Sequence, residues 1–243
     1  MNKKLKSKGF EISLGRTLLR SKDTNKIFIH PPYGEDNFIN LANEIERDRL
    51  EKPTFGDLVE FVYSALTLNE TNIDLKYSIF YSLPYFLMKH GQLLSFTGIY
   101  SVNNKGVYIE DFPKLLWCNC GFNRVVFDEN NLIERLEKED KRLRYVPFGF
   151  KEGIQTSDEI VKNPFILALC GSGEIAIRRT EMLSEIGKVS FSNFNRSINE
   201  KYLISIGYEP GITIIEKARA DDSEGDTRGY TFAWMKGDEK NEE

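Results

Sequence analysis

Residues Asn163–Leu183 read NPFILALCGSGEIAIRRTEML, and the conformation of this stretch decides the fold of the chain. An apolar run, a Gly-Ser-Gly corner and an amphipathic segment follow one another. A buried strand, a phosphate-binding loop and a helix have this order. Two helices joined by a glycine turn have it as well. The first interpretation predicts a ligand site, and the second predicts packing alone.

The helical interpretation explains more of these residues. Asn163 and Pro164 suit the N-cap and first turn of a helix, because proline lacks the N–H that would be unpaired there. Leucine and alanine dominate the run that follows, and both favour helix. Gly171 can end that helix, and Ser172 can cap a second one. We therefore predict two helices joined at a tight corner.

The second of these helices carries one residue that its pattern does not explain. Ile175, Met182, Leu183 and Ile186 form an apolar face, and at 100° per residue Arg179 falls within it. Because an unpaired buried charge is very costly, we predict that Arg179 is partly buried and paired with a carboxylate. The polar face carries three glutamates, which disfavours DNA binding through this helix.

The alternative interpretation rests on the spacing of Gly171, Gly173 and Ala176, which satisfies the G-x-G-x-x-G/A pattern of dinucleotide-binding loops. The segment CGSGEIAI also resembles the first motif of the class I S-adenosylmethionine-dependent methyltransferases, a resemblance that covers these residues only. It implies a glycine-rich loop under the methionine part of the cofactor. On this interpretation the ligand-binding residues are Gly171, Ser172, Gly173, Arg179 and Arg196.

The chain departs from both nucleotide-binding families after this loop. Those families place a carboxylate about twenty residues further on, where it holds the ribose hydroxyls. Asn193, Asn195 and Arg196 stand there instead, and Arg196 would suit a 2′-phosphate. Too little chain follows Arg196 to complete either fold in its usual order. We therefore expect no cofactor.

The N-terminal part of the chain predicts a hairpin and then helices. Residues 10–30 are expected to form a β-hairpin around the polar turn RSKDTN. A helix is expected from Asn37, and a second from Thr54, where TFGD resembles a capping box. A third helix is expected over residues 73–90.

The rest of the chain is expected to be rich in strands. Residues 93–102 and 106–112 flank the hairpin signal NNKG, and RVVF is a further candidate strand. An exposed helix, NNLIERLEKEDKRL, is expected after Asp128. Residues 201–218 and 228–235 predict an antiparallel C-terminal meander.

Because strands and helices come in blocks, the pattern favours an α+β fold over a doubly wound sheet. The expected architecture is an N-terminal β-hairpin, a helical layer and a mostly antiparallel sheet completed by C-terminal strands. We expect one α+β domain over residues 10–237, between a flexible basic tail at residues 1–9 and a flexible acidic tail at residues 238–243.

Composition narrows the classes of partner. The 243 residues are 40% hydrophobic and 29% charged, as in ordinary soluble globular proteins. A net charge of -4 disfavours general binding to nucleic acid. The most apolar stretch, YSIFYSLPYFLM, is too short to span a bilayer, and three cysteines are too few for a disulfide framework. We therefore expect a cytoplasmic protein without membrane or nucleic-acid partners.

The sequence shows no catalytic constellation. It lacks the motifs of serine hydrolases, P-loop NTPases and zinc metalloproteases. Its two histidines, His30 and His90, suit structural roles at the ends of elements. Cys118 and Cys120 could join Cys170 and His90 around zinc, but no second closely spaced pair supports a metal site. DDSEGD, residues 221–226, predicts a solvated hairpin tip rather than a calcium site.

These observations favour a cytosolic binding or interaction protein, acting with a protein partner or as a homo-oligomer. Its catalytic residues, if any exist, are not assigned by the sequence. The alternative function is a nucleotide- or S-adenosylmethionine-binding enzyme that uses the Gly171–Gly173 loop.

Overall fold

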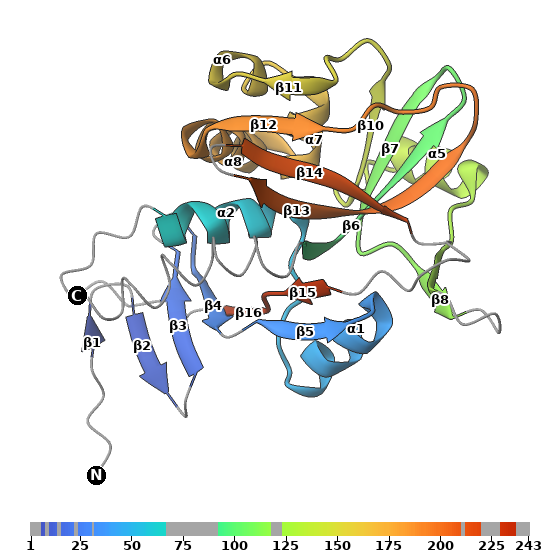
Figure 1. Ribbon diagram of the computed structural model, residues 1–243. Helices are drawn as coiled ribbons and strands as arrows, with labels where there is room; N and C mark the ends of the chain where they lie inside the picture. The colour runs from blue at the N-terminus through green and yellow to red at the C-terminus, as the bar shows by residue number, and fades with distance from the viewer. Residues whose placement is uncertain are drawn as a thin grey trace.

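The computed structural model of the chain describes residues 6–7, 10–13, 16–21, 24–30, 32–66, 92–117, 123–209, 212–219 and 229–236. Their strands form a five-stranded, a nine-stranded and a two-stranded sheet. Figure 1 shows the five-stranded sheet below helix α2 (Phe55–Leu66) and most strands of the nine-stranded sheet above it. Helices and mostly antiparallel strands together confirm the predicted α+β class.

The five-stranded sheet, called the small sheet below, contains both the first and the last strands described. Its order is β1-β2-β3-β4-β16, with every pair antiparallel. Strands β3 and β4 pair antiparallel, as the predicted hairpin requires, but the expected first strand of that hairpin is divided into β2 and β3. The strands are β1 (Lys6–Ser7), β2 (Phe10–Ser13), β3 (Arg16–Arg20), β4 (Lys26–His30) and β16 (Trp234–Lys236).

Helices α1 (Phe38–Arg47) and α2 (Phe55–Leu66) form where the sequence predicts them. The Asn37 side chain caps α1 by accepting a hydrogen bond from the backbone of Asn40. The capping box predicted for α2 is present: the Asp57 N–H donates to Thr54 Oγ1 (3.2 Å), and the Thr54 N–H donates to Asp57 Oδ2 (2.9 Å). The helix predicted over residues 73–90 lies outside the described residues.

The large sheet is built on the predicted hairpin of β6 (Leu93–Val102) and β7 (Gly106–Asp111). Strand β6 pairs on its other side with β13 (Glu200–Glu209), which forms an antiparallel hairpin with β14 (Ile212–Arg219). Every residue of β6 is buried, because the sheet is covered on both faces.

The C-terminal region differs from the predicted antiparallel meander. Strand β12 (Lys188–Phe191) lies parallel to β14, and β15 (Gly229–Thr231) lies parallel to β6 and antiparallel to β5 (Tyr33–Asp36). Local alternation of apolar residues sets which face of a strand is buried, but it does not name the neighbouring strand.

The middle of the chain supplies a small strand pair and four helices. The candidate strand RVVF contributes only its start to β9, and the helix after Asp128 ends at Glu137, because Glu139 takes a φ of 55°. The elements are β8 (Leu115–Trp117), β9 (Asn123–Val125), α5 (Glu129–Glu137), β10 (Leu143–Pro147), β11 (Gly153–Gln155), α6 (Ser157–Ile160), α7 (Pro164–Cys170) and α8 (Gly173–Ile186).

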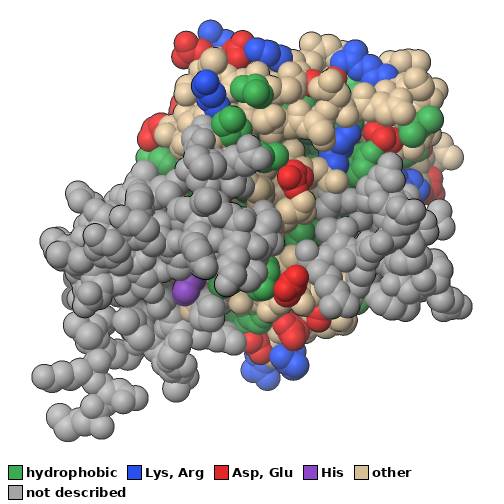
Figure 2. All heavy atoms as spheres, in the orientation of Figure 1, with side chains coloured by type: hydrophobic (Ala, Val, Ile, Leu, Met, Phe, Trp, Pro, Cys, Tyr) green, Lys and Arg blue, Asp and Glu red, His purple; other side chains and the backbone are tan. Residues whose placement is uncertain are grey.

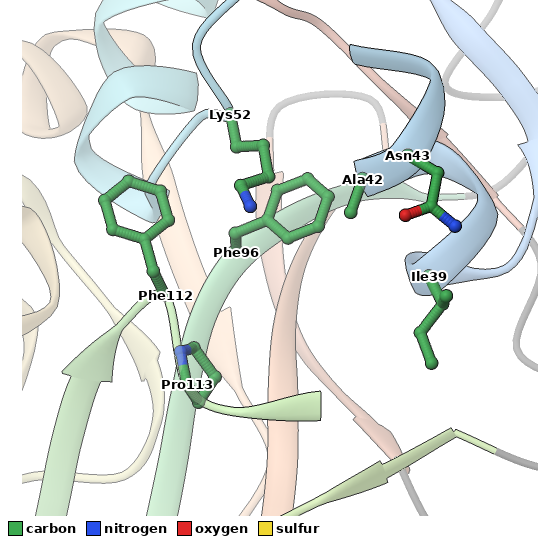
Figure 3. A pocket seen from close by; sticks show the side chains of 7 residues that line it. All are labelled: Ile39, Ala42, Asn43, Lys52, Phe96, Phe112 and Pro113. Carbon is green, nitrogen blue, oxygen red and sulfur yellow. The ribbon is translucent and has the colours of Figure 1, made fainter. Parts of the chain in front are cut away.

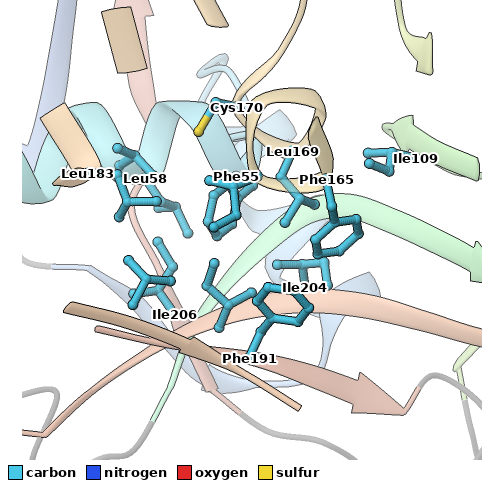
Figure 4. Packing of buried hydrophobic residues seen from close by; sticks show 14 of the residues in the cluster. Phe55, Leu58, Ile109, Phe165, Leu169, Cys170, Leu183, Phe191, Ile204 and Ile206 are labelled. Atoms are coloured by element: carbon cyan, nitrogen blue, oxygen red, sulfur yellow. The ribbon is translucent and has the colours of Figure 1, made fainter. Parts of the chain in front are cut away.

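Helices α2, α7 and α8 pack together over one face of the large sheet, with the larger hydrophobic cluster between them (Figure 4). Phe55 of α2, Phe165 of α7 and Leu183 of α8 are each at most 1% exposed. A second cluster on the opposite face joins α1 and α5 to the sheet through Phe38, Leu132 and their neighbours. Within the described residues, no helix is both long and apolar enough to cross a membrane.

Close packing at the start of α2 leads to a first prediction. A Cβ at Gly56 would lie 2.4 Å from the Cys170 carbonyl oxygen and 2.5 Å from Nη1 of Arg179. The Gly56→Ala substitution therefore forces α2 away from α7 and α8, and we expect it to lower the free energy of unfolding by about 1–3 kcal/mol. Urea denaturation measures this loss.

Arg178→Ala, at an exposed position of α8, is the control and should change stability by less than about 0.5 kcal/mol. A Gly56→Ala protein as stable as the wild type would contradict the close approach of these helices.

Candidate functional site

The stretch at Asn163–Leu183 forms two helices, as predicted. The Asn163 side chain caps α7 by accepting hydrogen bonds from the backbone of Phe165 (3.0 Å) and Ile166 (3.5 Å). Gly171 follows α7 with a φ of 133°, and its N–H donates to the carbonyl of Ala168. Since residues before the corner are helical, the buried strand that a nucleotide-binding loop follows is not formed here.

The buried face of α8 agrees with the predicted one in part, because Met182 and Leu183 are buried as expected. Ala176, Arg179, Thr180 and Leu183 recur at i, i+3, i+4 and i+7 and are buried, whereas Ile175 is 42% exposed. Counting only apolar residues misplaced this face, because Arg179 and Thr180 find polar partners and are buried with the others. Ser172 precedes α8 as predicted, but its hydroxyl makes no capping hydrogen bond.

Arg179 is buried and paired with carboxylates, which confirms the prediction. Its Nη2 lies 2.5 Å from Oδ1 of Asp57 and 3.2 Å from Oε2 of Glu60, and its Nη1 donates to the Cys170 carbonyl (3.2 Å). The side chains of Arg179, Asp57 and Glu60 are 8%, 4% and 0% exposed. The guanidinium therefore faces the protein interior rather than a ligand at the corner.

Strand β4 completes this buried ion cluster. Lys26 Nζ pairs with Asp57 and lies 4.0 Å from Glu60, and the Thr24 hydroxyl donates to Glu60. Burial alone would raise the pKa of Asp57, but the charges of Arg179 and Lys26 outweigh it, so that this pKa lies below its ordinary value. With two cations facing two carboxylates, the cluster is balanced and joins β4, α2 and α8.

Sequence reasoning found Arg179 but missed its partners. Asp57 and Glu60 are spaced i, i+3 in the otherwise apolar helix FGDLVEFVYSAL. Two carboxylates on the face of a helix that packs into the core require buried cations, and this spacing was the available signal.

Cys170 and His30, which belong to residue types common in catalytic and metal sites, both pack against other side chains of the protein. Cys170 is fully buried, and burial raises the pKa of its thiol to about 11. His30 at the end of β4 stacks on Phe232, and burial lowers the pKa of its imidazole. Among the described residues, no cluster of three or more histidine, cysteine, aspartate or glutamate side chains could hold a metal ion. Cys118, Cys120 and His90 lie outside those parts, as do residues 221–226.

Arg196 has its contacts in another region. It follows β12, where its Nη2 lies 2.5 Å from Oε1 of Glu152 and its guanidinium lies 5.0 Å from the ring centroid of Phe148. Of the residues predicted for a ligand, Gly171, Ser172, Gly173 and Arg179 lie together at the α7–α8 corner. The contacts of Arg196 are not with that corner.

A pocket lies elsewhere, between α1 and the edge of the second core cluster (Figure 3). It is half open and has a volume of about 230 Å³. Three of its lining residues come from α1, and the others come from the segment before α2, from β6 and from the turn after β7. The lining residues are Ile39, Ala42, Asn43, Lys52, Phe96, Phe112 and Pro113.

The aromatic wall of the pocket is held in an unusual backbone conformation. Phe112 has a φ of 59°, which non-glycine residues rarely adopt, and its side chain is 39% exposed. Its N–H donates to the Phe96 carbonyl (2.7 Å). Directly before it, Asp111 receives two hydrogen bonds from Arg144 (2.5 and 3.0 Å) and one from the Thr97 hydroxyl (2.8 Å). These bonds fix Phe112 at the pocket entrance.

Lys52 supplies the one charge among the lining residues. Its Nζ lies 2.5 Å from Oε1 of Glu46 and 5.8 Å from the ring centroid of Phe96. Figure 3 shows this nitrogen turned toward Phe96, in the space between Phe112 and α1. The pocket thus combines aromatic walls, one ammonium group and the amide of Asn43. No local motif in the sequence predicts this pocket, because its residues come from distant segments.

Comparison with known proteins leaves the function open. No family model and no curated protein matches the chain. One solved structure to which it is similar belongs to a study of how the C-type lectin fold accommodates massive sequence variation in Nanoarchaeota. The two chains are 11% identical, the match covers 83% of this chain and 93% of that one, and the TM-score is 0.49. At this identity and score, the likeness carries no argument about function.

The ion cluster yields a prediction about acid stability. Asp57→Asn leaves Arg179 and Lys26 with only one carboxylate, so we expect it to lower the free energy of unfolding by about 3–5 kcal/mol near neutral pH. Because the pKa of Asp57 is depressed in the folded state, its contribution is present above its ordinary pKa and is lost as the pH falls through the folded value. The difference between the two proteins should therefore shrink below pH 3.8.

Urea unfolding over a series of pH values measures both effects. Glu134→Gln, which removes an exposed partner of Lys138, serves as the control. A gap between wild type and Asp57→Asn that persists unchanged into strong acid would contradict this role of Asp57.

The surroundings of Cys170 predict its reactivity. With a pKa raised to about 11 and no exposed surface, its thiol should resist iodoacetamide in the native protein. Peptide mapping by mass spectrometry follows Cys170 separately from the other two cysteines. We expect modification only in denaturant; rapid modification of the folded protein would refute the buried position.

Proposed function

We propose that the protein is a non-enzymatic binding protein, and that the pocket between α1 and the Phe112–Pro113 turn receives a side chain of a protein partner. The single observation that carries this proposal is the pocket itself: an aromatic-walled cavity of about 230 Å³, open to solvent, with a strained and exposed phenylalanine at its entrance.

The volume of the pocket supports a side chain as its occupant. Sites for cofactors and drug-sized molecules measure about 300–1,000 Å³. A cavity of about 150 Å³ is sufficient for benzene. At about 230 Å³, this pocket fits one aromatic ring with its substituent and is too small for a dinucleotide or S-adenosylmethionine.

The lining supports binding rather than catalysis. A general acid or base needs a titratable group within reach of the substrate, and a nucleophile needs an adjacent base. Among the lining residues only Lys52 carries a titratable side chain, and it is paired with Glu46. The other polar group is the amide of Asn43.

The nature of the partner follows from the surface. On the face shown in Figure 2, acidic and basic side chains are interspersed on the described part, without a broad basic field for phosphates. A protein partner, including a second copy of this chain, therefore fits better than nucleic acid. A cytoplasmic location agrees with the free thiol of Cys170 and remains part of the proposal.

A blocked amino acid tests the proposal. N-acetylphenylalaninamide presents one aromatic side chain between two amide groups, as a partner chain would. We expect it to shift the NMR resonances of Ala42, Asn43 and Phe112, with a dissociation constant of about a millimolar. In the Ala42→Trp variant the indole fills the pocket, and the shifts should disappear.

Ile133→Trp places the same residue at an exposed position of α5 and should bind the probe as the wild type does. Absence of any shift at the pocket in the wild type would overturn the proposal. A rise in melting temperature with S-adenosylmethionine or nucleotides would support the alternative enzyme function instead.

A further inference from the structure

The charge inside the pocket identifies the class of partner more closely. We propose that the occupant is an aromatic side chain that carries or adjoins a carboxylate, and that this carboxylate pairs with Lys52 in place of Glu46. The inference rests on the proposed function, because it needs the pocket to be a binding site. It adds that the partner segment is both aromatic and acidic.

The existing ion pair shows that Lys52 can hold a carboxylate at the pocket. Its Nζ lies 2.5 Å from Oε1 of Glu46, while its side chain is 26% exposed and that of Glu46 is 59% exposed. Glu46 can move into water at little cost, because it is already mostly solvated. Replacing it by a ligand carboxylate keeps the ammonium paired, so the exchange leaves no buried charge without a partner.

The aromatic walls place the ring of the occupant. Phe96 is 3% exposed and forms the floor, whereas Phe112 is 39% exposed at the entrance. A ring seated against Phe112 and Pro113 would cover that exposed surface and gain the aromatic contact. Figure 3 shows the Lys52 nitrogen between Phe112 and Phe96, so the ring and the carboxylate of one ligand can be satisfied together.

The strained backbone of Phe112 also supports a binding role for the pocket. A positive φ at a non-glycine residue is costly and clusters at sites that hold ligands. Phe112 has this backbone conformation and an exposed side chain, whereas the neighbouring residues Phe96 and Pro113 are buried. The chain therefore keeps an exposed aromatic side chain next to an ammonium group.

The charge of the rim disfavours a cationic ligand. A basic group entering the pocket would meet the ammonium of Lys52, the charged residue of the lining. An acidic ligand would be attracted by this ammonium group. The carboxylate of Glu46, which pairs with Lys52, is the group that such a ligand has to displace.

Two probes that differ by one charge test this inference. N-acetylphenylalanine carries a carboxylate that is ionised at neutral pH, and N-acetylphenylalaninamide is its neutral analogue. In NMR titrations of the full chain we expect the acid to bind about threefold more tightly than the amide, as a partly exposed ion pair provides. The difference should decrease at high salt, because the pair is accessible to counterions.

Two substitutions separate the charge from the cavity. In Lys52→Gln the acid and the amide should bind equally, and the amide should bind as it does to the wild type. In Glu46→Gln the acid should bind more tightly than to the wild type, because no side-chain carboxylate competes for Lys52. Glu134→Gln on α5 removes a glutamate of another ion pair and should change neither affinity.

The outcomes distinguish the two proposals. If neither probe shifts the pocket resonances, the proposed function fails. If both probes bind the wild type equally, or if the preference for the acid survives Lys52→Gln, the carboxylate inference is overturned while the pocket remains a binding site for aromatic side chains.

Discussion

The arrangement of the helical layer depends on the pairing of Arg179 with two carboxylates of α2. Asp57 and Glu60 lie in a helix whose other buried side chains are mostly apolar, and without Arg179 and Lys26 their burial would be prohibitive. Helix α8 supplies one cation and strand β4 the other. The same contacts bring Gly56 against the Cys170 carbonyl, so the ion cluster and the closest helix approach are one feature. Burying such a cluster costs desolvation energy. Its charge pairing favours one arrangement of the three elements over the alternatives.

This buried cluster is linked to the pocket through the residues at the start of α2. While Oδ1 of Asp57 faces the cations, Oδ2 accepts the Thr54 N–H and fixes where the helix begins. The residues just before that turn are held in consequence, and the Pro53 carbonyl accepts the Phe96 N–H at 2.8 Å. Lys52 is thereby placed beside Phe96. A carboxylate in the core thus helps to position the ammonium group that lines the pocket.

The sequence predicted those features whose cause is local. The caps at Asp128 and Asn163 and the box at Thr54 involve neighbouring residues, and a single-helix projection placed Arg179 among apolar side chains. The partners of Arg179 lie 122 and 119 residues away, and no pattern along the chain joins them. The parallel pairing of β12 with β14 was missed for the same reason. The pocket could not be predicted, because the sequence of each contributing segment indicates only a helix, a strand or a turn.

The small sheet joins the two ends of the described chain, since Lys26 of β4 lies opposite Lys236 of β16. During synthesis β4 leaves the ribosome long before β16 exists, and until then the edge of β4 beside the buried Ile27 and Phe28 has no partner. Pairings between such distant segments form slowly, because a long loop must close first. A nascent chain of this protein therefore carries an open, apolar strand edge for most of its translation, and such an edge is what holding chaperones protect from aggregation.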